Sequence, residues 1–356
     1  MSRKGTSMRK MSSLERCMAV LNGEVPDCVP VIPQTFMFAI ENAGMKMADV
    51  VRNPARMADA LIHCMDQFAY DACVIDFDVV TLAEACGAKV VFRENDPAVI
   101  DESDLAVEDW GAVASLRVPD PWNDGRLPIW LETTRIIAQR VGDRAFIMGR
   151  ADQGPFTLAC MLRGPQQFMM DLLTEEDPTP IYALIDYCRQ ACAAFAKAQK
   201  VAGAHATSIG DAFAGPALIS PVLYRKFALQ PETVLAKEVQ DFGIPLSIHI
   251  CGNTASIISD MGKTGARILE VDWQLDMELA RRSIPNNTVL MGNINPSDPL
   301  VLGTPESTSA AVQEVIRKTG GRGLFLSSGC ALGRNTPPEN LQALVNAVRE
   351  FGILGE

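Results

Sequence analysis

Short apolar runs rich in β-branched residues recur along the chain, and longer segments with helical periodicity separate them. This alternation is typical of repeated strand–helix units, in which helices connect parallel strands. The chain contains eight such runs, at residues 29–34, 71–78, 145–153, 205–211, 245–252, 267–273, 288–294 and 324–330. Eight runs, with no glycine-rich phosphate turn after the first, predict a single (β/α)8 TIM barrel of the α/β class rather than an open doubly wound sheet.

The rest of the 356 residues fits around this barrel. We expect residues 1–12 to form a flexible N-terminus and residues 13–356 to form one barrel domain. An excursion at about residues 79–143 separates the second run from the third. It contains an extended segment followed by an acidic loop, which predicts a hairpin or lid over the barrel mouth.

Charge and hydropathy exclude several classes of partner. The chain has 32 basic and 43 acidic residues, a net charge of −11, which argues against nucleic acid and against an anionic membrane surface. It has neither an apolar run long enough for a membrane helix nor a secretory signal at its start. We therefore expect a cytoplasmic protein whose ten cysteines are free thiols or metal ligands.

Polar side chains stand where the predicted strands end, which is where (β/α)8 enzymes carry their active sites. His249 and Cys251 are two residues apart and therefore point to the same side of their strand. Together with Cys330, after the last run, they supply two thiols and an imidazole, the donors of a catalytic Zn²⁺ site with an open fourth position. Asp211, after the neighbouring run, is a candidate weak fourth ligand and catalytic residue. On the residues alone, packing within the strands remains an alternative for each of them.

Such a donor set predicts a particular chemistry. Zinc held by two thiolates and one imidazole carries little net positive charge, so it activates water poorly. It can instead bind an incoming thiol and hold it as a nucleophilic thiolate. A methyl donor is the natural partner of that nucleophile.

Several motifs resemble the uroporphyrinogen decarboxylase superfamily, and specifically its cobalamin-dependent methyltransferase branch. They include HICGNT from His249, MGNINP from Met291 and SSGCALGRNTPPENLQALV from Ser327. The resemblance implies that His249, Cys251 and Cys330 bind zinc, and that Asp211 occupies the place of an acidic fourth ligand. It also implies methyl transfer between methylcobalamin, carried by a separate corrinoid protein, and a small thiol such as coenzyme M.

Other residues and activities stay open at this stage. Phe156, Trp273 and Asn293 are candidates to line the substrate and corrinoid side, with core packing as the alternative. A related enzyme could run the transfer in the other direction and demethylate a small methylated substrate. Uroporphyrinogen decarboxylase itself is a further alternative, because Asp78 resembles the acidic residue that holds the pyrroles. Its substrate has eight carboxylates and calls for arginines near the N-terminus, and residues 33–44 contain none.

Overall fold

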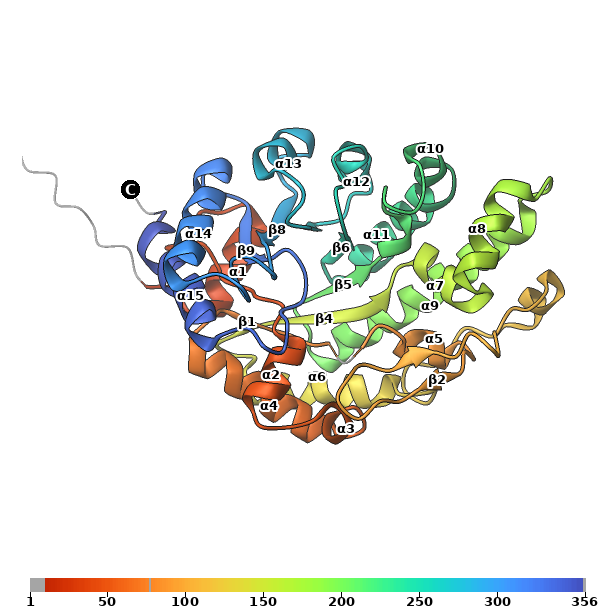
Figure 1. The fold of residues 1–356 in the computed structure, drawn as a ribbon, viewed down its shortest axis with the longest axis horizontal. Coiled ribbons are helices and arrows are strands. Elements are labelled where there is room, and N and C mark those ends of the chain that lie inside the picture. The colour runs from red at the N-terminus through yellow and green to blue at the C-terminus, as the bar shows by residue number, and fades with distance from the viewer. Residues whose placement is uncertain (1–9, 77, 355–356) are drawn as a thin grey trace, which may run out of the picture.

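A curled sheet of seven parallel strands forms the centre of the computed structural model, which describes residues 10–76 and 78–354 (Figure 1). Neighbouring strands pair in the order β1-β4-β5-β6-β7-β8-β9. They are β1 (Ala72–Val74), β4 (Phe146–Gln153), β5 (Ala206–Gly210), β6 (Leu246–Ile250), β7 (Ile268–Val271), β8 (Val289–Ile294) and β9 (Leu324–Ser328). Seven of the eight predicted runs therefore form strands, and the fold is of the TIM-barrel class.

The first predicted run, residues 29–34, does not form a regular strand. It contributes one isolated bridge, between Val31 and Leu326 of β9. On its other side, the Val31 carbonyl accepts a hydrogen bond of 2.8 Å from the Asp71 amide. Pro30 and Pro33 have no amide hydrogen and cannot donate to a strand ladder, which explains why the prediction of eight full strands was wrong here.

Helices surround the sheet on its outer side (Figure 1). Neighbours pack pairwise, as α4 does against α6, α6 against α9 and α9 against α11. The α-helices are α1 (Ser13–Asn22), α2 (Phe36–Asn42), α3 (Met47–Val50), α4 (Pro54–Phe68), α5 (Thr81–Ala85), α6 (Leu127–Val141), α7 (Pro155–Arg163), α8 (Pro165–Thr174), α9 (Thr179–Ala202), α10 (Pro221–Leu223), α11 (Leu229–Asp241), α12 (Ile258–Lys263), α13 (Met277–Ser283), α14 (Pro305–Thr319) and α15 (Pro338–Phe351). Shorter helical segments are η1 (Trp110–Ser115), η2 (Ala212–Ala214) and the π-helix η3 (Tyr224–Ala228). None of the helices in the described part of the chain is long and apolar enough to cross a membrane.

The interior of the curled sheet changes from apolar to polar along the strands. Near their amino ends, Ala72, Phe146, Ile268 and Phe325 pack into one buried cluster, which also includes Val74 and residues of α1. Because side chains alternate between the two sides of a strand, the interior positions that follow include Asp76, Arg150 and Glu270. We call this set the polar interior layer: Gln34, Asp76, Arg150, Ser208, Ser247, His249, Glu270, Asp272 and Ser327. It lies toward the carboxyl ends of the strands, where this class of fold carries its chemistry.

The excursion between β1 and β4 contains the predicted hairpin. Its strands β2 (Val90–Val91) and β3 (Val99–Ile100) pair in antiparallel fashion. Arg334, in the loop that follows β9, forms an ion pair with Asp96 in the turn of this hairpin. The excursion is therefore attached to the same loop that carries Cys330.

The start of the described chain is held in place by hydrogen bonds. The Met11 amide donates to Asp27 at 3.0 Å, and Ser12 forms a reciprocal capping box with Glu15 at the start of α1. These bonds hold residues 11 and 12 in place. Of the segment expected to be flexible, residues 1–12, residues 1–9 lie outside the described residues, and the flexibility of the segment remains a prediction.

Candidate metal centre

Strand register brings the three predicted metal ligands together. His249 in β6 lies opposite Glu270 in β7, and Cys251 follows two residues later on the same side. Cys330 comes two residues after the end of β9. The donor atoms of His249, Cys251 and Cys330 all lie within 4.8 Å of one another, with His249 Nε2 3.0 Å from Cys251 Sγ.

A backbone carbonyl orients the imidazole of this group. His249 Nδ1 lies 3.2 Å from the Glu270 carbonyl oxygen, which can only accept a hydrogen bond. Nδ1 is therefore the protonated nitrogen, and the lone pair of Nε2 faces the two thiols. Metal-binding histidines are commonly fixed by such a bond on the second nitrogen.

The hydrogen bond between the two thiols shifts their pKa values in opposite directions. A hydrogen bond from Cys251 holds the pKa of the Cys330 thiol well below its usual range against the effect of burial, and His249 adds to this. The same bond and burial raise the pKa of Cys251. The hydrogen bond to Cys330 also raises the pKa of His249, although burial opposes it. Because metal binding requires thiolates and a neutral imidazole, the group is set up to exchange these protons for a metal ion.

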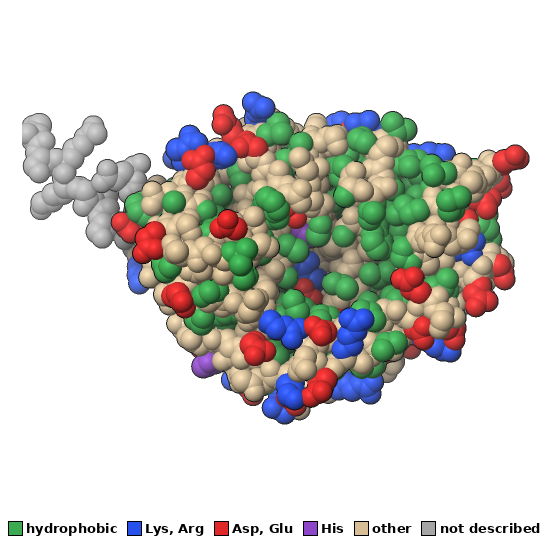
Figure 2. Space-filling view, in the orientation of Figure 1, with side chains coloured by type: hydrophobic (Ala, Val, Ile, Leu, Met, Phe, Trp, Pro, Cys, Tyr) green, Lys and Arg blue, Asp and Glu red, His purple; other side chains and the backbone are tan. Residues whose placement is uncertain are grey.

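Two thiols and an imidazole at this spacing fit Zn²⁺ in chemistry. Thiolate and imidazole are the ligands that zinc prefers, and three protein ligands leave one position for another molecule. Both cysteines are partly exposed, whereas the other eight cysteines are buried and all ten are free. In Figure 2 the visible face is hollowed near its centre, and histidine, basic and acidic side chains are visible at the base of the hollow.

A buried ion-pair network lies beside the donors. Arg150 contacts Asp76 Oδ2 at 3.0 Å and Glu270 Oε2 at 3.3 Å, and it donates to Gln34 at 3.1 Å. Ser247 donates to the other oxygen of Glu270 at 2.8 Å. Burial raises the pKa of Asp76 to about 7, although Arg150 opposes the shift. The network places one cation between two carboxylates.

Sequence reasoning did not count Asp76, Arg150 or Glu270 among the site residues. A signal for them was present, because Asp76 is two residues after Val74 and Arg150 two after Met148. Both apolar residues belong to the interior cluster, so alternation puts Asp76 and Arg150 on the same interior side.

The structure does not place Asp211 with the three donors. Its carboxylate accepts hydrogen bonds from the amides of Phe156 and Thr157 at 3.3 and 2.6 Å, at the start of α7. Burial raises the pKa of Asp211, although these bonds oppose the shift. In this arrangement Asp211 caps a helix, and a role as fourth ligand remains a prediction.

Asp78 is occupied by other partners. It is fully buried, and its carboxylate accepts hydrogen bonds from Arg126 at 2.6 Å and from the Thr81 hydroxyl at 2.8 Å. Arg126 also pairs with Glu84 at 2.5 Å. The carboxylate that would hold pyrroles in a decarboxylase thus closes an internal ion pair here.

The three predicted substrate-side residues lie in different surroundings. Phe156 is fully buried and packs edge-on against Phe168 with ring centres 5.4 Å apart, so it offers no surface to a corrinoid. Asn293 donates to the carbonyls of Asp272 and Leu275 at 3.0 and 2.7 Å and thereby fixes the loop after β7. Trp273 is 46% exposed in that loop and is the one of the three with a large free surface.

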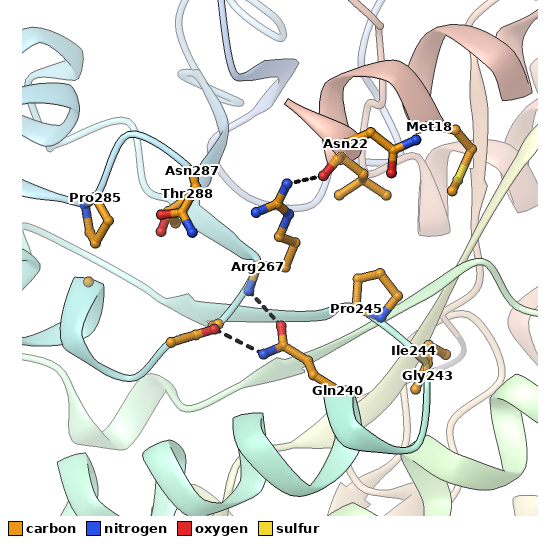
Figure 3. Close-up of a pocket in the computed structure, with 14 residues that line it drawn as sticks. Met18, Asn22, Gln240, Gly243, Ile244, Pro245, Arg267, Pro285, Asn287 and Thr288 are labelled. Atoms are coloured by element: carbon orange, nitrogen blue, oxygen red, sulfur yellow. Dashed lines mark hydrogen bonds between the residues drawn. The ribbon is translucent and has the colours of Figure 1, made fainter. Parts of the chain in front are cut away.

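A separate cavity of about 580 Å³ lies at the amino ends of β6, β7 and β8 (Figure 3). Its polar wall is built by Gln240, whose side chain accepts from the Arg267 amide at 2.9 Å and donates to the Gly265 carbonyl at 2.9 Å. Since residues at this end of such barrels serve stability, and the metal donors are at the other end, the cavity is not part of the candidate site.

The fold and the donor group together define an α/β protein of the TIM-barrel class with a candidate metal site at the carboxyl ends of the strands. The sequence profile described as uroporphyrinogen decarboxylase (URO-D) matches residues 12–351, and the chain belongs to this family.

Relatives of two activities are found within the family. A methylcobamide:CoM methyltransferase (MtbA) of Methanosarcina acetivorans is 29% identical over 97% of this chain and 99% of its own length. A uroporphyrinogen decarboxylase of Syntrophotalea carbinolica is 28% identical over 86% of this chain and 87% of its own length. The structure of a methyltransferase from Methanosarcina mazei superposes with a TM-score of 0.87 at 27% identity, covering 96% of this chain and 99% of that one. The resemblance to the methyltransferase branch is thus confirmed.

Proposed function

We propose that this chain transfers a methyl group from a methylated corrinoid to a thiol bound at a zinc ion held by His249, Cys251 and Cys330. The observation that carries the proposal is the convergence of these three donors within 4.8 Å of one another. Zinc supplies a position at which an incoming thiol loses its proton and remains a nucleophile. The relatives named as methylcobamide:CoM methyltransferases support the corrinoid part of the proposal.

The bond changes balance without a further reactant. The thiol releases its proton, and the sulfur uses an electron pair to form the new bond to the methyl carbon. The bond between cobalt and carbon breaks with both electrons remaining on the metal, so Co(III) becomes Co(I). The chain's own contribution is to orient His249 through the Glu270 carbonyl and to provide two thiolates in a hollow beside the open position.

We propose further that the corrinoid arrives on a separate protein and that Trp273, exposed near the donors, belongs to the surface that meets it. A cytoplasmic location is part of the same proposal and is supported by the ten free cysteines. Transfer in the opposite direction would use the same metal ligands. The assay distinguishes the two directions by whether the methylated corrinoid or a small methylated substrate is supplied. The pairing of Asp78 with Arg126 does not favour the decarboxylase alternative.

The test combines metal analysis with turnover. The purified full chain is analysed for zinc and assayed for demethylation of methylcobalamin by a panel of thiols. We expect about one zinc ion per chain and thiol-dependent turnover. Cys330→Ala should lose both, with activity falling at least about 100-fold, because loss even of a residue that only supports a ligand costs 10- to 100-fold.

A matched control is Cys28→Ala. Cys28 is buried away from the donors, and its thiol donates to the Val348 carbonyl at 3.3 Å. This variant should keep zinc and activity. A zinc-free, inactive wild type would contradict the proposal, as would a Cys330→Ala protein that retains both properties.

A further inference from the structure

The polar interior layer carries more negative than positive charge around the candidate metal centre. Asp76, Glu270 and Asp272 supply three carboxylates, and Arg150 supplies one guanidinium. These groups lie in the same layer as His249, at the carboxyl ends of the strands. A molecule bound at the open metal position therefore meets a net negative surrounding.

Arg150 is largely occupied by carboxylates. Its side chain is only 8% exposed, and its nitrogens contact two carboxylates and Gln34, although Nε makes no hydrogen bond. The other buried arginines in the described part of the chain are likewise paired with carboxylates: Arg16 with Asp27 and Asp71, Arg126 with Asp78 and Glu84, and Arg163 with Asp171. An anionic group next to the metal centre would thus be buried without a free cation.

Buried polar atoms without hydrogen-bond partners are found at the same place. Asp76 Oδ1 is buried and has no hydrogen-bond partner, although Oδ2 of the same carboxylate contacts Arg150. Arg150 Nε and the hydroxyls of Ser208 and Ser327, which can donate or accept, also have no partner, so Asp76 Oδ1 is the one purely accepting atom among these four. A buried carboxylate oxygen without a donor is costly, so a ligand that donates a hydrogen bond to Asp76 Oδ1 would bind favourably.

Given the proposed function, we propose that the methyl acceptor is a thiol whose other end is a hydrogen-bond donor, preferably a positively charged amine, and that Asp76 binds this amine. Neutral hydroxyl thiols rank second and anionic sulfonate thiols last. Asp76 is then a specificity-determining residue that contacts the substrate. Coenzyme M, the thiol in the names of two relatives that are 29% and 28% identical to this chain, is a sulfonate thiol and would therefore rank last.

Three two-carbon thiols test the ranking, because they differ only in the end group. Cysteamine, 2-mercaptoethanol and 2-mercaptoethanesulfonate are titrated into the zinc-loaded full chain by calorimetry, and each is then assayed with methylcobalamin. We expect cysteamine to bind at least about tenfold more tightly than the sulfonate, given one favourable and one unfavourable charge in a partly buried site. A wild type that binds the sulfonate more tightly overturns the inference.

The three thiols differ in acidity as well as in end group. Comparison of the variant Asp76→Asn with the wild type cancels the difference in acidity, because it affects both proteins alike. The substitution removes the carboxylate charge and keeps the shape of the side chain. The ratio of the cysteamine affinity to the sulfonate affinity should therefore be about tenfold smaller than in the wild type. Asp260→Asn is the control, since Asp260 is buried on α12 against Arg225 and Lys263, outside the polar interior layer. An unchanged ratio in Asp76→Asn overturns the inference.

The two levels of the proposal fail in different ways. If no thiol is methylated and no zinc is bound, the proposed function fails. If methyl transfer proceeds while the sulfonate is preferred, only the assignment of the acceptor and of Asp76 fails. If Asp76→Asn does not fold, the ranking in the wild type still decides.

Discussion

Removing the guanidinium of Arg150 tests whether the buried network is held by charge. In Arg150→Met, Glu270 would remain fully buried without its cation, after losing a contact of 3.3 Å. Breaking a buried ion pair by removing one partner costs about 3–5 kcal/mol. The pKa of Asp76, which is about 7 beside Arg150, rises further when Arg150 is lost, so in this variant Asp76 takes up a proton and its share of the cost is small near neutral pH. We therefore expect a loss near the lower limit, about 3 kcal/mol of unfolding free energy.

Urea titrations of single and double variants measure this loss. Arg150→Met combined with Glu270→Gln removes the guanidinium and the charge of Glu270. It should regain more than half of the lost stability, because Asp76, the other partner of Arg150, can take up a proton. Arg135→Met is the control, since Arg135 forms an exposed pair with Glu132 and should cost less than about 1 kcal/mol. If Arg150→Met costs no more than that control, or if the double variant is no more stable than the single one, charge pairing does not hold the network.

Three further predictions concern single residues. Burial lowers the pKa of His205, so on acidification the unfolded chain is protonated at this histidine before the folded chain is. The unfolding free energy should therefore fall as the pH drops from about 7.5 to about 5.5. In His205→Asn, the urea midpoint should fall less over this range. Asp211→Ala should lose about 1–2 kcal/mol of stability, because the amides of Phe156 and Thr157 at the start of α7 lose their acceptor. The variant should keep its zinc, and loss of zinc would instead identify Asp211 as a ligand. Arg334→Gln should change the unfolding free energy by less than about 1 kcal/mol, because the pair with Asp96 is largely exposed. Trypsin should nevertheless cut faster at Arg93, because the hairpin is no longer attached to the loop after β9. An unchanged cleavage rate would show that the pair does not hold the hairpin.

Much of the fold followed from local pattern. The strands after the first were predicted from apolar runs because the strands of a parallel sheet are buried on both sides and read as continuous apolar segments. The exception at residues 29–34 came from Pro30 and Pro33, whose missing amide hydrogens limit the ladder. That signal was in the sequence, and it was outweighed by the apolar character of the run.

The candidate site was predicted as far as strand ends and alternation could determine it. His249, Cys251 and Cys330 came together because each follows or ends a strand of one sheet. Asp211 also follows a strand, but its short side chain turns to the amides of α7, which depends on how that helix packs. Phe156 is also placed by a helix contact, since its ring packs into the core against Phe168 of α8, and this packing could not be predicted from strand ends.

The central claim is that His249, Cys251 and Cys330 hold a zinc ion that binds the acceptor thiol. X-ray absorption spectroscopy at the zinc edge tests it most directly, because it counts sulfur neighbours. For the full chain we expect two sulfur atoms at about 2.3 Å and one imidazole nitrogen, and a third sulfur after cysteamine is added. A protein without zinc, or a sulfur count that does not rise when thiol is added, would contradict the account.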